Sequence, residues 1–134
     1  KDPGNLGTII RTLDWFGYSQ LFCSKDTVDH FNSKVIMASM GSIFRTKVHY
    51  LDFDSLQKKF PNHMIYGTYL EGENIHKTII NEKSIIVMGN ESHGISEKTN
   101  NLVKNKISIP KIGKAESLNV STATAIVLNE IIRN

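Results

Sequence analysis

The feature that most constrains this fold is the stretch from residue 107 to 126, where a short apolar segment, a loop of small residues and a slender helix follow one another. Ile107, Ile109 and Ile112 flank Pro110. Because proline has no N–H for a sheet ladder, the strand is expected to end there. The small residues that follow leave the backbone accessible to a ligand or to another subunit.

Two polar side chains near the start of the final helix, Ser117 and Asn119, allow two interpretations. Serine and asparagine commonly cap helices, because their side-chain oxygens accept hydrogen bonds from free backbone N–H groups. The alternative is that they face a bound ligand. Spacing alone favours capping.

The N-terminal region predicts an amphipathic helix from Asn5 to Gly17, with Asn5 as a fair N-cap and Gly17 as a fair stop. At about 100° per residue, Arg11 lies opposite the apolar stripe, on the side of Gly7 and Trp15. It therefore faces solvent or a ligand. The stripe consists of Leu6, Ile9, Ile10, Leu13 and Phe16.

Strands and helices alternate along the rest of the chain. Such alternation with short connections predicts an α/β domain with a mainly parallel sheet and helices on both faces. Ligands bind such sheets at the carboxyl ends of the strands, where Thr68, Gly89 and Pro110 are expected. The predicted strands cover residues 19–24, 48–53, 64–68 and 84–88, and the predicted helices cover 32–42 (with Val35, Ile36 and Met40 inward), 54–60, 95–103 and 119–133; residues 68–84 are expected to be a polar loop with a helical turn near 75–79.

Length and composition indicate one soluble globular domain. The chain has 134 residues, of which 40% are hydrophobic and 22% charged. No apolar run approaches the roughly 20 residues that span a bilayer, and no signal peptide is visible, so we expect a cytoplasmic protein without a membrane partner. A single cysteine, expected to be a buried thiol, excludes an internal disulfide, and five scattered histidines offer no ligand spacing. We predict no metal.

The charge distribution permits nucleic acid as a partner. Net charge is +3 with a pI of about 9.0, and four lysines surround the stretch described first. Lysines usually form a solvated face. The alternative is that they hold RNA phosphate, which predicts salt-sensitive binding. They are Lys104, Lys106, Lys111 and Lys114.

Three motifs occur in order across nearly the whole chain, and together they resemble those of the SpoU (TrmH-type) RNA ribose 2'-O-methyltransferases of the SPOUT superfamily. The first spans residues 2–12 and carries Asn5, Gly7 and Arg11, the second spans 86–96 and carries Gly89, Glu91 and Gly94, and the third spans 117–121 with Ser117 and Asn119. The resemblance implies a SPOUT fold with a C-terminal trefoil knot. It also implies a homodimer, in which the final helix and the helix that bears Arg11 pair. Trp15 and Phe16 then serve either in that interface or in the core.

The implied activity is transfer of a methyl group from S-adenosylmethionine to a ribose 2'-hydroxyl of RNA, with ribosomal RNA favoured over transfer RNA. By the same resemblance, the donor is held by the backbones of Gly89, Ile109 and Leu118, with Thr68 lining its pocket. The implied catalytic residues are Arg11, Asn5, Glu91, Ser117 and Asn119.

Arg11 is the family's candidate for activating the hydroxyl. Because a guanidinium is effectively always protonated in proteins, we expect Arg11 to grip an RNA phosphate and orient the hydroxyl. The other four residues would hold Arg11, the loops and the ribose in place, although Glu91 is also well suited to bracing its own loop.

Family members usually have a strand before the first motif, and many carry an N-terminal RNA-binding domain. We therefore expect residues 1–134 to be a single catalytic domain without that strand and that domain. The rival functions are a transfer RNA 2'-O-methyltransferase, a non-catalytic RNA-binding module with the same fold, and a nucleotide-binding regulatory domain.

Overall fold

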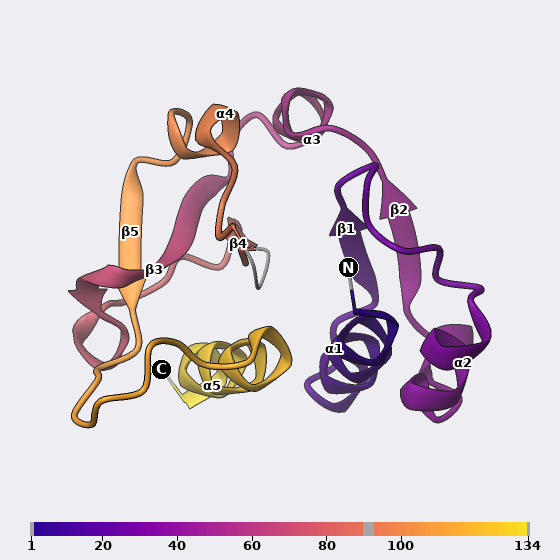
Figure 1. Cartoon of the computed structure of the whole chain (residues 1–134). Helices are drawn as coiled ribbons and strands as arrows, with labels where there is room; N and C mark the ends of the chain where they lie inside the picture. The colour runs from indigo at the N-terminus through magenta and orange to yellow at the C-terminus, as the bar shows by residue number, and fades with distance from the viewer. Residues whose placement is uncertain (1, 90–92, 134) are drawn as a thin grey trace. The chain divides into compact units, whose positions relative to one another are not determined.

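The computed structural model describes residues 2–89 and 93–133 and divides the chain into two compact units, Lys1–Phe60 and Pro61–Asn134 (Figure 1). Each unit has its own small parallel sheet. Within the described ranges, no helix combines the length and the apolar character needed to cross a membrane.

Unit 1 holds the parallel pair β1 and β2, in which Gln20 lies opposite Lys47 and Cys23 opposite Tyr50. Helices cover both faces of this pair. Leu21, Cys23, Val48 and Tyr50 pack toward α1 and α2, whereas Phe22 stacks on His49 and meets the ring of Phe60 at the end of α3. Its elements are α1 (Pro3–Trp15), β1 (Gln20–Cys23), α2 (Ser33–Ser39), the 3-10 helix η1 (Ser42–Phe44), β2 (Lys47–Tyr50) and α3 (Phe53–Lys59).

The start of α1 differs from the sequence prediction. Asp2, and not Asn5, caps the helix, because its Oδ1 accepts hydrogen bonds from the backbone N–H groups of Gly4 (2.7 Å) and Asn5 (3.2 Å). Asn5 therefore lies in the first helical turn. The predicted stop is confirmed, since Gly17 follows the C-cap with a φ of +82°, a conformation suited to glycine.

The inward face of α2 was only partly predicted. Val35 is fully buried, but the expectation for Ile36 and Met40 is wrong, since both are exposed. The helix ends in a left-handed residue, Met40 with a φ of 50°, and the small Ser39 occupies the buried position before it.

Unit 2 is built on a three-stranded parallel sheet with the order β4-β3-β5. Successive strand residues face opposite sides of a sheet. Tyr66 belongs to the core cluster that includes Val127 of α5, while a side chain at Gly67 would meet Val103 and Ile95, which flank α4. The elements are β3 (Met64–Asn74), the 3-10 helix η2 (Ile75–Lys77), β4 (Ser84–Val87), α4 (Glu97–Asn100), β5 (Asn105–Ser108) and α5 (Val120–Arg133).

The parallel strands and the helices on both faces confirm the predicted α/β class in each unit. Two boundaries in unit 2 were wrong. Strand β3 does not give way to a loop at Thr68 but continues to Asn74, because the chain bulges and then pairs with β5 again. Helix α4 is one turn long, ending at Asn100, where a helix from 95 to 103 was expected.

Candidate active site

Three adjacent strands of unit 2 bring three of the predicted donor-binding residues to one edge of the sheet. Thr68 lies opposite Ile107 of β5, and its Oγ1 donates a hydrogen bond to the carbonyl oxygen of Val87 at 3.0 Å. Gly89 follows Val87 by two residues, and Ile109 follows the end of β5. Thr68, where the regular ladder of β3 is interrupted, therefore lies beside the carboxyl ends of β4 and β5, which is where parallel α/β sheets bind ligands.

The bulge in β3 begins directly after Thr68. Ile107 faces Thr68 and then also Glu73, so the residues between them leave the regular ladder. Gly72 brings this segment back against β5, because a Cβ there would lie 2.9 Å from the carbonyl carbon and oxygen of Lys106. Ser108 then donates from Oγ to the carbonyl oxygen of Gly72 at 3.1 Å. The bulge is thus held against the strand that leads to Ile109.

Gly89 has a structural role in the packing of the chain after β4, apart from any contact with a ligand. A Cβ at this position would lie 2.7 to 2.9 Å from backbone atoms of Gly94 and Ile95. Gly94 has a φ of +65°, which favours glycine. The two glycines let the chain after β4 turn and return closely upon itself. Glu91, the predicted catalytic carboxylate of this loop, lies outside the described residues.

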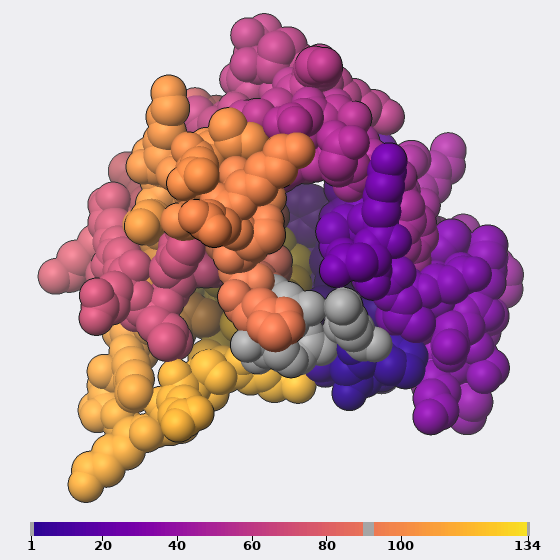
Figure 2. Space-filling view, turned by 45° about the horizontal axis from the view of Figure 1, so that its top comes forward, coloured from indigo at the N-terminus to yellow at the C-terminus, as the bar shows by residue number. Residues whose placement is uncertain are grey.

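The segment from 109 to 119 projects from the rest of unit 2 (Figures 1 and 2) and carries Ser117 and Leu118, both exposed. At its end Asn119 caps α5. Its Oδ1 accepts from the backbone N–H groups of Ser121 (2.9 Å) and Thr122 (3.4 Å). For Asn119, the capping interpretation is therefore confirmed.

The remaining predicted residues, Arg11 and Asn5, belong to unit 1. Arg11 is exposed on α1, as its position opposite the apolar stripe requires. Gly7 is instead buried against α2, where a Cβ would lie 2.5 Å from the Cβ of Ala38. The first motif thus combines a glycine that lets two helices approach with an arginine that faces outward.

One arrangement that sequence reasoning missed involves Lys106, one of the four lysines noted above. Its Nζ lies 4.9 Å from the ring centroid of Tyr69, which is a cation–π distance. The Tyr69 hydroxyl donates to Oδ1 of Asn100 at 2.6 Å, and burial raises the pKa of that hydroxyl. Because the three residues are far apart in sequence, no local pattern could have linked them.

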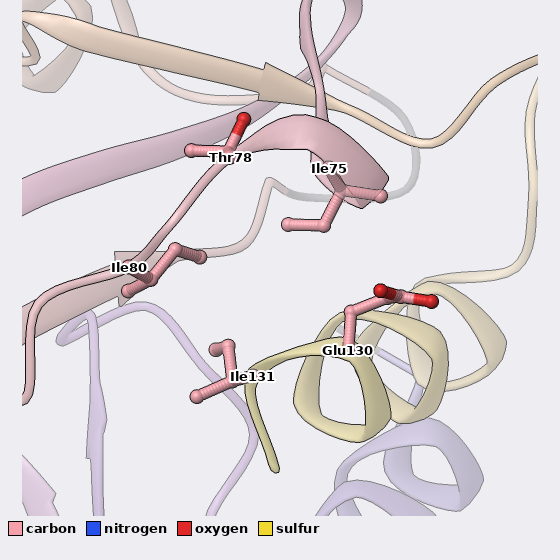
Figure 3. A pocket seen from close by; sticks show the side chains of 5 residues that line it. All are labelled: Ile75, Thr78, Ile80, Glu130 and Ile131. Atoms are coloured by element: carbon pink, nitrogen blue, oxygen red, sulfur yellow. The ribbon is translucent and has the colours of Figure 1, made fainter. Parts of the chain in front are cut away.

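Sequence reasoning also missed the buried carboxylate of Glu130 on α5 (Figure 3). Glu130 lies 2.8 Å from Nδ1 of His76 in η2 and accepts a hydrogen bond from Arg133 at 2.9 Å. It lines a small pocket together with Ile75, Thr78, Ile80 and Ile131. The apolar lining and the lack of free space make this a packing contact between η2 and α5, not a donor site. A signal existed, because Glu130 stands three residues after Val127 of the apolar stripe.

Two exposed apolar side chains, Ile112 and Leu118, stand on the projecting segment. Within the described ranges, no cluster of three His, Cys, Asp or Glu residues with metal-binding potential occurs.

Comparison with known proteins gives one consistent family. The model of the SpoU rRNA Methylase family matches residues 1–129. The 23S rRNA (guanosine(2553)-2'-O)-methyltransferase RlmP of Bacillus subtilis is 34% identical over 131 residues, which cover 96% of this chain and 53% of that protein. The tRNA (guanosine(18)-2'-O)-methyltransferase of Aquifex aeolicus is 31% identical, over 99% of this chain and 65% of its own length.

Comparison with solved structures identifies the same family. The crystal structure of the SpoU methyltransferase AviRb from Streptomyces viridochromogenes, in complex with the cofactor AdoMet, matches with a TM-score of 0.92 and 26% identity over 99% of this chain and 56% of that one. The chain thus spans between about half and two thirds of the length of the proteins it matches.

Proposed function

Since this chain belongs to the SpoU rRNA methylase family, we propose that it forms the catalytic part of an S-adenosylmethionine-dependent enzyme that methylates a ribose 2'-hydroxyl of ribosomal RNA. Its parallel α/β architecture is that of the SPOUT enzymes. The observation that carries the proposal is that Thr68 lies beside the carboxyl ends of β4 and β5, the two strands after which Gly89 and Ile109 follow. The trefoil knot stays a prediction from the family.

The donor-binding role falls to the edge in unit 2. When bound, S-adenosylmethionine supplies an electrophilic methyl group on a sulfonium. The backbones of Gly89, Ile109 and Leu118 would hold its adenosine, and Thr68 would line the pocket. The hydrogen bond from Thr68 to Val87 supports this assignment, because it fixes the Thr68 side chain at the end of β4, where the β3 ladder is interrupted.

The acceptor-binding role falls to Arg11. A guanidinium offers several donors in a planar fork and suits a phosphate group. Holding the RNA backbone beside the hydroxyl would supply the positioning on which an in-line methyl transfer depends. Asn5, Glu91 and Ser117 would support the loops and the ribose. Asn119 would act through its cap, which fixes the start of α5 directly after Leu118.

Ribosomal RNA is the favoured substrate because RlmP, which is similar to 96% of this chain, is named as a 23S rRNA methyltransferase. Transfer RNA is the alternative, and the Aquifex relative supports it. Lys104, Lys106, Lys111 and Lys114 are all exposed, and the last two stand on the projecting segment, so they suit either RNA. The same proposal includes a homodimer and a cytoplasmic location, where both RNAs are present.

Labelled methyl transfer tests the proposal. The chain is incubated with methyl-labelled S-adenosylmethionine and, separately, unmodified 23S rRNA and unmodified transfer RNA. Ribose methylation of 23S rRNA is the expected result, whereas label in transfer RNA alone would favour the alternative substrate.

The matched variant is Arg11→Lys, which keeps the charge but loses the fork. We expect it to bind donor normally by calorimetry and to lose methylation about 10-fold or more, as disrupted positioning typically does. Full activity of Arg11→Lys would refute the geometric role of Arg11. A wild-type chain that binds donor and RNA without transfer would be a non-catalytic module, and one that binds other nucleotides but no donor would be a regulatory domain.

A further inference from the structure

Unit 1 exposes several large apolar side chains on α1, α2 and η1. Trp15 is 85% exposed and Phe44 of η1 is 87% exposed, and Met37 and Met40 of α2 are also exposed. Helices α1 and α2 lie side by side here (Figure 1), packed through Gly7. Exposure of large apolar side chains to water is unfavourable, so a group of them marks an interaction surface.

The two aromatic residues flank one fixed junction. The Asp14 carboxylate accepts hydrogen bonds from Ser42 Oγ at 2.8 Å and from Arg45 Nε at 2.9 Å, and Arg45 Nη2 lies 2.8 Å from the same oxygen. Trp15 follows Asp14 directly and Phe44 precedes Arg45. The network therefore fixes the backbone that carries both rings at the junction of α1 and η1, and neither ring is buried.

Two cations accompany these rings. Arg11 is exposed one helical turn before Trp15, and residues four apart lie on the same helix face. The Arg45 side chain is 62% exposed even though it pairs with Asp14. Exposed aromatic rings and arginines on one surface match the chemistry of single-stranded RNA, whose bases stack on rings and on guanidinium planes.

We propose that Trp15, Phe44, Arg11 and Arg45 form a stacking surface that binds unpaired RNA bases adjacent to the nucleotide that is methylated. This inference rests on the proposed function, because it uses the RNA phosphate contact of Arg11 as its starting point. Trp15 lies one turn from Arg11, so a base next to the gripped phosphate would reach the indole ring.

The family resemblance implies that α1 takes part in a homodimer, so a second copy of the chain is the rival occupant of this surface. Charge favours RNA, because a twofold-symmetric dimer that pairs this patch with itself would bring cations near the axis against cations. A polyanion with flat bases complements the same surface in both charge and shape.

The test exploits the fact that Trp15 is the one tryptophan of the chain. Titration of the full chain with an unstructured 12-nucleotide RNA should quench Trp15 fluorescence, and anisotropy of the labelled RNA gives its affinity. We expect Trp15→Ala and Phe44→Ala each to weaken RNA binding about 10-fold, which is within the range for loss of one stacked base. Trp15→Phe keeps a ring and should retain most of the affinity.

Phe31→Ala is the control, since Phe31 is another exposed aromatic of unit 1 but lies before the N-terminal end of α2, beside His30. Unchanged RNA affinity in Trp15→Ala and Phe44→Ala would overturn the proposal. So would a loss of affinity accompanied by a change from dimer to monomer in sedimentation velocity, because the surface would then be a subunit interface.

The outcomes separate this inference from the proposed function. If RNA quenches Trp15 fluorescence, Phe44→Ala weakens that quenching and the chain transfers no methyl group, the stacking surface is supported and the proposed enzymatic function is refuted. Methyl transfer that neither variant reduces would support the enzyme and refute the stacking surface.

Discussion

Replacement of Gly7 by alanine tests whether the first motif contributes to the fold through the packing of α1 on α2. In Gly7→Ala the new Cβ would lie 2.5 Å from the Cβ of Ala38, 2.6 Å from the carbonyl oxygen of Val35 and 3.0 Å from the backbone nitrogen of Ser39. Carbon atoms in contact prefer separations of roughly 3.5 to 4.0 Å. Two of the three neighbours are backbone atoms, so α2 itself would have to move by about 1 Å.

Overpacking of this kind typically costs about 1–3 kcal/mol. Where no clash occurs, alanine stabilises a helix by about 1 kcal/mol relative to glycine. Because two of the clashes involve backbone, we place the cost of overpacking in the upper part of its range, at about 2–3 kcal/mol. After the gain in helix propensity of about 1 kcal/mol, we expect Gly7→Ala to lower the free energy of unfolding by about 1–2 kcal/mol. With a urea slope of about 2 kcal/mol per molar, the unfolding midpoint should fall by about 0.5–1 M.

The assay is urea unfolding followed by circular dichroism. The matched control is Gly113→Ala, since a Cβ at Gly113 would meet nothing within 4 Å, and its stability should not fall. Adding Ala38→Gly to Gly7→Ala removes the nearest clash but leaves the Val35 carbonyl, so it should restore only part of the loss. A Gly7→Ala chain as stable as wild type would refute the close packing of α1 on α2 and would leave ligand contact as the role of Gly7.

Three further predictions concern single side chains. Asn119→Ala removes the cap of α5 and should lower the free energy of unfolding by about 1 kcal/mol, measured by urea unfolding, whereas Asn119→Asp should preserve it. The hydrogen bond from Ser42, and then that from Arg45, lowers the pKa of Asp14 below its ordinary value of 3.8. The ionised carboxylate therefore stabilises the fold above pH 3.8, and this contribution is lost as the pH falls through the lowered pKa. The loss of unfolding free energy caused by Ser42→Ala at pH 7 should therefore become smaller in unfolding curves measured in acid. A loss that stays the same at every pH would contradict this assignment. Burial raises the pKa of the Cys23 thiol to about 11, so a thiol reagent at pH 8 should label the native chain far more slowly than the urea-unfolded chain, and equal rates would show the thiol to be accessible.

Local patterns were sufficient for the elements with strong periodicity. The spacing of Leu6, Ile10 and Leu13 predicted α1 and its buried face, and it therefore placed Arg11 outside. Alternation of short strands and helices predicted the parallel α/β class. The spacing of three motifs predicted the family that the chain matches over residues 1–129.

Local patterns failed where two nearby residues could fill the same role and where distant residues set the path of the backbone. Asp2 rather than Asn5 caps α1, although both residue types cap well. Strand β3 continues beyond Thr68 because Ser108 and Lys106 of β5 receive the segment around Gly72. A pattern of polar residues could not reveal that second pairing.

The sequence by itself determined which residues of α1 face a core and which family the chain belongs to, because side-chain periodicity and motif spacing act over a few residues. Only the tertiary structure decided that Thr68 meets Val87 and that Gly7 admits Ala38. It alone also showed that Glu130 pairs with His76. These contacts join residues 19 to 54 positions apart, and the register of parallel strands and the packing of helices across the chain select such partners.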